Sequence, residues 1–150
     1  MNFTFEKQTI ECIKKLVAEN TTVAITTHYN SDGDAIGSST ALAEVLRQMG
    51  KTVKILLPND YPQFFKWMHG VDDILTLDRH PKPIRKYINE MDLLICLDIN
   101  DLSRTEDLQP LFEQAGKKSI VVDHHINLQI NADAVVSFPE ASSTCELLYH

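Results

Sequence analysis

Cysteine, glycine, proline and long apolar runs are all scarce in this sequence of 150 residues. The cysteines Cys12, Cys96 and Cys145 are odd in number and widely spaced, which excludes a disulfide framework and the paired ligands of a zinc knuckle. We expect them to be buried free thiols. No apolar run is long enough to span a bilayer, and residues 1–7 lack the pattern of a signal peptide. We therefore expect a cytoplasmic protein that does not enter a membrane.

Positive charge is also in short supply. The sequence has 14 Lys and Arg residues against 21 Asp and Glu residues, which gives a formal net charge of −7. This sign argues against a protein that coats nucleic acid by bulk electrostatic attraction. A nucleotide substrate remains compatible with it, because bound divalent cations would concentrate positive charge at one place.

Apolar strand signals alternate with amphipathic helix signals along the chain, without repeats or linker-like segments. The expected strands span residues 22–27, 53–57, 74–77, 93–97, 119–122 and 134–137. The expected helices lie around residues 10–17 and at 35–49, 83–89, 108–115 and from 142 onward. This pattern predicts an α/β fold, with a parallel β-sheet flanked by helices on both faces in a Rossmann-like arrangement. We interpret residues 1–150 as one such domain.

Residues that can bind metal stand directly after three of these strands. They are His28, Asp32, Asp34, Asp98, Asp123, His124 and His125. The carboxyl ends of parallel strands meet at one edge of the sheet, so these side chains should converge there. Carboxylates this close repel one another unless cations neutralise them. Imidazole and carboxylate ligands without thiolate favour Mn²⁺, Mg²⁺ or Fe²⁺, and one bridging Asp would hold two ions about 3.5–4 Å apart.

Each cluster by itself also has a structural explanation. A single Asp at a strand end is usually a turn former or a helix cap, and Asp-x-Asp with Gly is common in surface turns. The coincidence of three clusters at equivalent strand ends favours a metal site. The glycines fit this interpretation, because Gly33 would let the loop turn so that Asp32 and Asp34 both point inward. Gly37 would let backbone or phosphate approach the start of the next helix.

The order and spacing of these residues resemble the DHH phosphoesterase superfamily, the RecJ-like enzymes, which is named for the Asp-His-His triplet found here at 123–125. The resemblance extends from about Val23 to the end of the chain. Residues 27–38 and 141–146 are most similar to the branch of bifunctional oligoribonucleases and 3′-phosphoadenosine-5′-phosphate phosphatases. Ser31 stands where these enzymes commonly have Pro, and we expect little effect because Ser31 is not a ligand.

The resemblance implies a set of five metal ligands. His28 and Asp32 would hold a first divalent cation, for which Mn²⁺ is expected. Asp34 and His124 would hold a second. Asp98 would bridge the two cations.

The resemblance also implies three catalytic residues, Asp98, His125 and Asp123. His125 would contact the scissile phosphate, and Asp123 would orient a neighbouring histidine from behind. The implied activity is Mn²⁺-dependent hydrolysis of short single-stranded oligonucleotides to nucleoside 5′-monophosphates. Small phosphate esters such as 3′-phosphoadenosine 5′-phosphate are further implied substrates. A homodimer is left open.

Two features of the family have no counterpart in this sequence. The family has a further Asp ligand of the second metal, and a C-terminal substrate-binding domain with a Gly-rich motif that contains His. Neither occurs before His150, and the helix signal that starts at Ser142 or Ser143, with Glu146 at capping-box spacing, has no stop signal. We therefore expect the front part of a longer protein, which alone would bind the second metal poorly and lack most of its substrate specificity.

Three other readings stay open. Within the same superfamily, the substrate could be pyrophosphate, polyphosphate or a cyclic dinucleotide. The chain could instead be a non-catalytic module that binds a nucleotide without cleaving it. A signalling domain with Asp98 as phosphoacceptor is the third alternative, but it would not need His28, His124 or His125.

Overall fold

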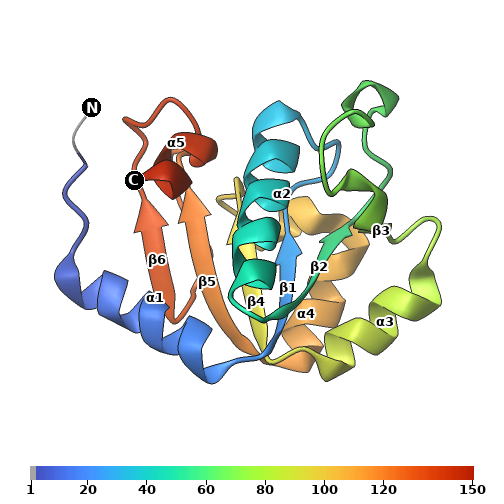
Figure 1. The fold of residues 1–150 in the computed structure, drawn as a ribbon, viewed down its shortest axis with the longest axis horizontal. Helices are drawn as coiled ribbons and strands as arrows, with labels where there is room; N and C mark the ends of the chain where they lie inside the picture. The colour runs from blue at the N-terminus through green and yellow to red at the C-terminus, as the bar shows by residue number, and fades with distance from the viewer. Residues whose placement is uncertain (1–2) are drawn as a thin grey trace.

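The computed structural model describes residues 3–150 as a parallel sheet between two layers of helices (Figure 1). The strands are β1 (Thr22–Thr26), β2 (Thr52–Leu57), β3 (Leu75–Thr76), β4 (Leu93–Leu97), β5 (Lys118–Asp123) and β6 (Ala134–Ser137). The α-helices are α1 (Lys7–Glu19), α2 (Gly33–Gln48), α3 (Pro81–Glu90), α4 (Gln109–Ala115) and α5 (Thr144–Tyr149). Short 3₁₀ helices are η1 (Gln63–Phe65), η2 (Val71–Asp73) and η3 (Leu102–Leu108). The predicted fold class is confirmed.

The sheet has the strand order β3-β2-β1-β4-β5-β6, and every pair of neighbours is parallel. The chain runs outward from β1 in one direction and then returns to β4 on the other side of β1. In such sheets the crevice at this switch point, outside the carboxyl ends of the strands, is where ligands bind. Thr26 pairs with Cys96, and Leu97 pairs with Val122, so β1, β4 and β5 end at the same edge.

Both faces of the sheet are covered by helices, which explains why the central strands are apolar throughout. Helices α1, α2 and α5 cover one face through residues such as Leu16, Ile36 and Leu147. Helices α3 and α4 cover the other face, where Ile84 and Phe112 are buried. Each buried side chain of this size contributes about 1.5–3 kcal/mol of transfer free energy. The packed sheet is therefore a rigid support for the loops at its carboxyl edge. None of the helices within residues 3–150 is long and apolar enough to cross a membrane.

The structure differs from the predicted elements mainly where the chain forms short helices. None of the 3₁₀ helices η1, η2 and η3 was predicted, because such short turns carry no 3.6-residue periodicity. The strand expected at 74–77 is reduced to the two residues of β3 at the sheet edge. Helix α2 starts at Gly33, two residues before its predicted start, because the Asp32 side chain caps it.

The turn predicted at Gly33 is wrong, and Gly37 is in contact with side chains of other segments. Gly33 lies inside the helix and is not among the glycines with positive φ, so it forms no special turn. A Cβ atom at Gly33 would lie 3.7 Å from the Phe65 ring. A Cβ atom at Gly37 would lie 3.3 Å from Cys145 Sγ and 3.9 Å from Met68 Cε. Gly37 therefore lets α5 pack closely against the first turns of α2, whereas a Cβ atom at Gly33 would make only ordinary contact with the loop between β2 and β3.

Burial of the cysteines, which the sequence predicted for all of them, is confirmed only for Cys96. Burial raises the pKa of the Cys96 thiol to about 12. Cys12 and Cys145 are half-buried. Partial burial, with a hydrogen bond to Asp34, raises the pKa of Cys145 to about 12 as well, so both thiols are protonated at neutral pH.

We expect the substitutions Gly37→Ala and Cys145→Ala to be coupled. A methyl group at Gly37 should crowd the Cys145 sulfur and offset the roughly 1 kcal/mol that alanine gains over glycine inside a helix. In a Cys145→Ala background the crowding is gone, so the same substitution should stabilise. Urea unfolding of the four proteins would measure the coupling, which we expect to be about 1 kcal/mol. If the effects of the two substitutions on the free energy of unfolding are additive, the contact between positions 37 and 145 contributes no coupling free energy.

Candidate metal centre

The loops that follow β1 and β4 bring three of the predicted ligands together. His28 Nε2 lies 3.7 Å from Asp98 Oδ2 and 3.9 Å from Asp32 Oδ1. His28 and Asp98 are buried, whereas the Asp32 side chain is mostly exposed. Ligand atoms of these three residues all lie within 4.8 Å of one another, which is close enough for one cation to contact all of them.

The loop after β5 adds a second group that shares Asp98 with the first. His124 Nε2 lies 3.4 Å from Asp98 Oδ1 and 3.5 Å from Asp34 Oδ2. His125 approaches the same Asp98 oxygen, and ligand atoms of Asp98, His124 and His125 also lie within 4.8 Å of one another. Six of the seven residues expected at this edge therefore meet there, and Asp98 stands between the two groups.

Hydrogen bonds assign the ring nitrogens of two histidines. His28 Nδ1 lies 2.8 Å from the carbonyl oxygen of Tyr29, and His124 Nδ1 lies 3.3 Å from that of Ala141. A carbonyl can only accept, so in each neutral ring Nδ1 carries the hydrogen and Nε2 presents a lone pair. Both lone pairs face carboxylate oxygens, which also only accept. Opposed acceptors of this kind are satisfied by a cation between them, or by a second proton on the imidazole.

The pKa of His28 is shifted in the direction expected for an imidazole that faces a carboxylate. Burial alone would lower it, and the positive charge of Arg104 acts in the same sense. The hydrogen bonds to Asp98 and to the Tyr29 carbonyl outweigh both, so the pKa of His28 is raised above its ordinary value. Without a metal, a proton can therefore occupy the position between His28 and Asp98.

Asp98 is held in a strained conformation at the end of β4. Its φ is 58°, in the left-handed region that costs a non-glycine residue about 1 kcal/mol or more. Its side chain is buried, with the residue only 1% exposed, and Oδ1 accepts a hydrogen bond of 3.1 Å from Thr144 Oγ1. Its backbone N–H donates to the Val122 carbonyl at 3.1 Å, which continues the pairing of β4 with β5. The sheet thus supports a conformation that turns this carboxylate toward the histidines.

Asp32 and Asp34 are oriented by the starts of two different helices. Asp32 caps α2, since Oδ1 accepts from the backbone N–H groups of Asp34 and Ala35 at 3.0 and 3.1 Å. Asp34 accepts from the first backbone N–H groups of α5, at 2.7 Å from Thr144 and 2.9 Å from Cys145. Burial would raise the pKa of Asp34, but these hydrogen bonds, that of the Cys145 thiol and the nearby His124 lower it overall. Asp34 is therefore a carboxylate that stays ionised.

The start of α5 explains why those N–H groups point at Asp34. Ser143 caps the helix, as one of the two predicted candidates, and its hydroxyl accepts from the Glu146 backbone N–H at 3.0 Å. The Glu146 carboxylate reaches back to the N–H and hydroxyl of Ser142, at 2.8 Å each. In a capping box the Glu146 carboxylate would accept from the backbone N–H of Ser143, the capping residue. Here it accepts from Ser142 instead, one residue earlier in the chain.

Asp123 and His125 form a pair beside the two groups. His125 Nδ1 lies 2.8 Å from Asp123 Oδ1, and the His125 backbone N–H donates to the other oxygen at 3.1 Å. Asp123 is fully buried, whereas His125 is half-buried. The pair fixes the His125 ring and leaves Nε2 available. This contact is the one expected of a residue that orients a neighbouring histidine, as the resemblance implies for Asp123.

Sequence reasoning missed the groups that orient the ligands. The carbonyls of Tyr29 and Ala141 and the N–H groups of Thr144 and Cys145 are backbone atoms, which no residue type reveals. Arg104 was also missed, although its carbonyl accepts from the Tyr29 N–H at 2.7 Å. The only available signal was the similarity of residues 141–146 to the family, which marked the segment without assigning it a contact.

The fold and this cluster define an α/β protein with a carboxylate and imidazole centre, suited to divalent cations, at the switch point of its sheet. The chain belongs to the DHH family, because the N-terminal domain of that family matches residues 22–150. The family membership that the motifs predicted is thus confirmed.

Two solved structures are similar to this chain. An exopolyphosphatase-related protein from Bacteroides fragilis is 34% identical, with a TM-score of 0.95 over 99% of this chain. The exonuclease RecJ bound to manganese is 19% identical, with a TM-score of 0.53 over 97% of this chain, and shares the fold. The chain spans 44% of the length of the first protein and 36% of the second.

Proposed function

We propose that this chain is the metal-binding domain of a hydrolase that uses two divalent cations, with Mn²⁺ expected, to cleave phosphoester bonds. The observation that carries the proposal is the position of Asp98, whose two oxygens lie 3.7 and 3.4 Å from the Nε2 atoms of His28 and His124. The donor set fits this chemistry, because it is made of carboxylates and imidazoles whose lone pairs oppose one another. A domain that only stores or senses nucleotides has no need for this arrangement.

In this proposal His28, Asp32 and Asp98 hold one cation, and Asp98, Asp34 and His124 hold the other. When bound, the two cations polarise a phosphate oxygen and lower the pKa of a water molecule between them. The chain's own groups fix the geometry: the Tyr29 and Ala141 carbonyls keep hydrogen on Nδ1, so that each Nε2 stays a ligand. Asp123 holds the His125 ring with Nε2 free to contact the scissile phosphate.

For the substrate we propose short single-stranded oligonucleotides, which would be cleaved to nucleoside 5′-monophosphates, together with 3′-phosphoadenosine 5′-phosphate. The similarity of residues 27–38 and 141–146 to the oligoribonuclease branch supports this choice. A second candidate is inorganic polyphosphate or pyrophosphate. The similarity to an exopolyphosphatase-related protein over 99% of this chain favours it.

A matched pair of substrates tests the proposal in the full-length protein. We expect the dinucleotide pApA to release AMP with Mn²⁺ present and EDTA to abolish this release, as chromatography of the products would show. Inorganic tripolyphosphate, assayed in parallel, separates the two candidate substrates. If neither compound is hydrolysed with any of Mn²⁺, Mg²⁺ or Fe²⁺, the proposal of a phosphoesterase is rejected. Nucleotide binding without Mn²⁺ and without turnover would identify a binding module instead.

A further inference from the structure

Two aromatic side chains on one short turn are left almost bare. Phe64 and Trp67 are 70% and 81% exposed, and they stand three residues apart in the loop between β2 and β3. Each ring would be worth a large gain in apolar burial if it were covered. Their exposure is therefore a feature that the stability of residues 3–150 does not explain.

The exposure does not result from a loose loop, because the neighbouring side chains anchor it. Phe65 and Met68 pack against the core and lie 3.7 and 3.9 Å from the Cβ positions of Gly33 and Gly37. The Tyr61 hydroxyl donates to the Val71 carbonyl at 3.2 Å and ties the two ends of the loop together. The anchors Phe65 and Met68 flank Lys66 and Trp67, and the ring centroid of Phe64 lies 4.3 Å from that of Phe65, so the backbone that carries both exposed rings is held in place.

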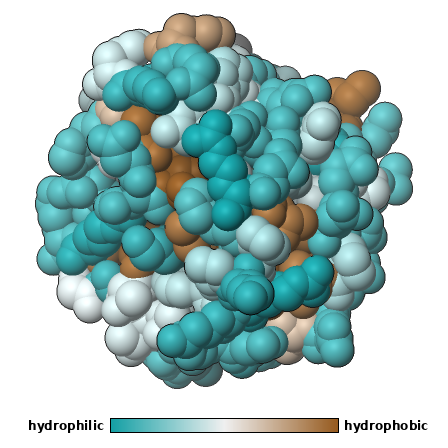
Figure 2. Space-filling model, turned by 90° about the vertical axis from the view of Figure 1, so that its right-hand side faces the viewer, coloured by the Kyte–Doolittle hydropathy of each residue, from teal (hydrophilic) through white to brown (hydrophobic). Residues whose placement is uncertain are grey.

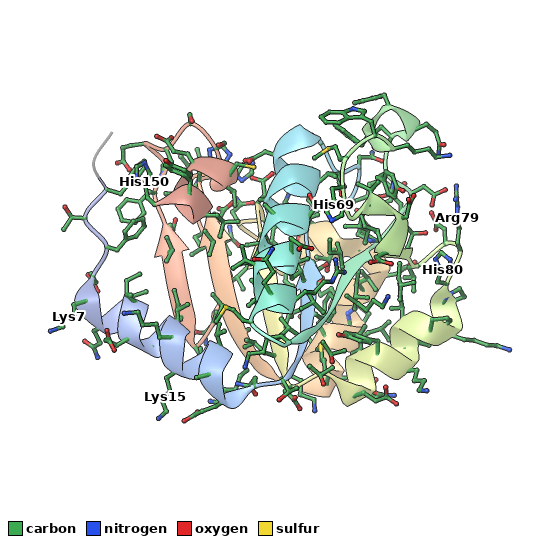
Figure 3. All side chains as sticks on the ribbon, viewed as in Figure 1. Lys7, Lys15, His69, Arg79, His80 and His150 are labelled. Atoms are coloured by element: carbon green, nitrogen blue, oxygen red, sulfur yellow. The ribbon has the colours of Figure 1, made fainter. Side chains whose placement is uncertain are left out.

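This anchor places the loop beside the candidate metal centre. Phe65 contacts the position of Gly33, which lies between Asp32 and Asp34 in the chain. Figure 1 shows the loop, in green, standing beside the N-terminal end of α2 at the carboxyl edge of the sheet. Figure 3 labels His69 of the same loop beside α2, where its Nε2 atom lies 3.7 Å from Glu44 Oε2. A ligand whose phosphate lies at the metal centre therefore has the loop as a neighbour.

We propose that Phe64 and Trp67, here called the aromatic platform, stack a nucleobase of the substrate whose scissile phosphate lies at the metal centre. The inference rests on the proposed function and narrows its substrate to base-bearing phosphoesters. Exposed rings are the usual stacking surface for single-stranded nucleic acid, because every base offers an aromatic face. Polyphosphate and pyrophosphate contain no such face and would make no use of the platform.

The surroundings of the platform fit a nucleotide better than an apolar protein surface. Gln63, Lys66 and His69 are exposed around the rings, where Lys66 supplies a positive charge and His69 faces the Glu44 carboxylate at 3.7 Å. Figure 2 shows this side of the molecule as mainly hydrophilic, with hydrophobic side chains visible between the hydrophilic ones near its centre. A base with its attached phosphates combines an aromatic face with negative charge, which matches such a mixed surface.

A neighbouring cleft of about 870 Å³ between α3 and α4 fits a nucleotide less well. It is lined by Tyr29 and Arg85 but also by the carboxylates of Asp78, Glu106 and Asp107. Three acidic groups against one guanidinium would repel a phosphate chain. The segment that carries the platform has no carboxylate between Gln63 and His69, and the Glu44 carboxylate beside it faces His69, so a phosphate chain meets fewer acidic groups here than in the cleft.

The test compares variants of the full-length protein on pApA and on tripolyphosphate with Mn²⁺. Trp67→Ala is expected to lower kcat/KM for pApA by about 10- to 100-fold and to leave any tripolyphosphate hydrolysis unchanged. Trp67→Phe keeps a ring and should stay within about threefold of wild type. Met49→Ala, at a residue that is 58% exposed at the far end of α2, is the matched control and should change neither rate.

A binding measurement separates failure of this inference from failure of the proposed function. Wild-type protein, Trp67→Phe and Trp67→Ala are titrated with a phosphorothioate-linked ApA in the presence of Mn²⁺. Calorimetry gives the affinity of each protein, and tryptophan fluorescence is recorded in parallel. Stacking predicts quenching in wild type that is absent in Trp67→Phe. It also predicts that affinity is retained in Trp67→Phe and lost in Trp67→Ala. This result would support stacking even if no substrate is hydrolysed. Unchanged affinity in Trp67→Ala overturns the inference. An equal loss for pApA and tripolyphosphate also overturns it, because the rings would then support the fold or contact the rest of the protein.

Discussion

Asp98→Asn is expected to lower kcat/KM of the full-length protein by at least about 1,000-fold, which corresponds to about 4 kcal/mol of transition-state stabilisation. Asp98 contributes a carboxylate oxygen to both groups of candidate ligands, so its substitution should disturb both of the proposed cations at once. An amide keeps the volume of the side chain and tolerates the positive φ of 58°. The loss would therefore be chemical in origin.

The same variant should be at least as stable as the wild type when metal is removed. Asparagine replaces a buried carboxylate by a neutral group, and its N–H can donate to an Nε2 lone pair of His28 or His124. Thermal unfolding in EDTA would measure this, and Asp107→Asn, at an exposed position, is the control for both activity and stability. Retention of activity in Asp98→Asn would remove Asp98 from the centre. A collapse in stability would show that the activity loss reports unfolding.

The convergence of the site on one edge could be predicted from sequence because it depends on topology. Strands that are apolar throughout are parallel and covered on both faces, and parallel strands end at the same edge. His28, Asp98 and His124 each follow a strand directly, so their meeting follows from the strand assignment. The same reasoning found the helices that have 3.6-residue periodicity, although the starts of α2, α3 and α5 each differ from the predicted start by two residues.

The parts that could not be predicted depend on packing between segments that are distant in the chain. Asp34 is oriented by backbone N–H groups 110 and 111 residues later, and no local pattern encodes such a contact. The sequence predicts a turn at Gly33 and close approach of backbone or phosphate at Gly37, but the structure places Phe65 in ordinary contact with the first and the Cys145 sulfur tightly against the second. The identity of a glycine does not distinguish these causes, since both require the absence of a Cβ atom.

Mn²⁺ is expected to stabilise the folded protein, because only the folded state assembles the ligands. At a concentration one hundred times the dissociation constant, the gain should be about 2.7 kcal/mol, or roughly 5–10 °C in Tm. His28→Ala should remove most of this gain. His69→Ala should retain it, since the His69 side chain is 86% exposed on the loop between β2 and β3. Equal shifts in both variants would show that Mn²⁺ binds elsewhere.

The pH dependence of the stability contributed by His28 should have opposite signs without and with metal. Without metal, the folded-state pKa of His28 lies above its ordinary value of 6.5. Burial and Arg104 lower this pKa, but Asp98 and the Tyr29 carbonyl raise it by more. Asp32, which also faces the ring, adds a negative charge. Protonated His28 therefore stabilises the protein below the unfolded-state pKa, and this stabilisation is lost as the pH rises through the raised pKa.

With saturating Mn²⁺ the order reverses, because a histidine must be neutral to act as a ligand. Protons then compete with the metal, so the stability contributed by His28 should rise with pH over the same interval. The difference in Tm between wild type and His28→Ala, measured from pH 5.5 to 8 in EDTA and in Mn²⁺, isolates this contribution from other titrating groups. Opposite slopes in the two conditions require that one position between His28 and Asp98 accepts either a proton or a metal ion. Parallel slopes would mean that Mn²⁺ does not contact His28, and the proposed ligand set would then be wrong.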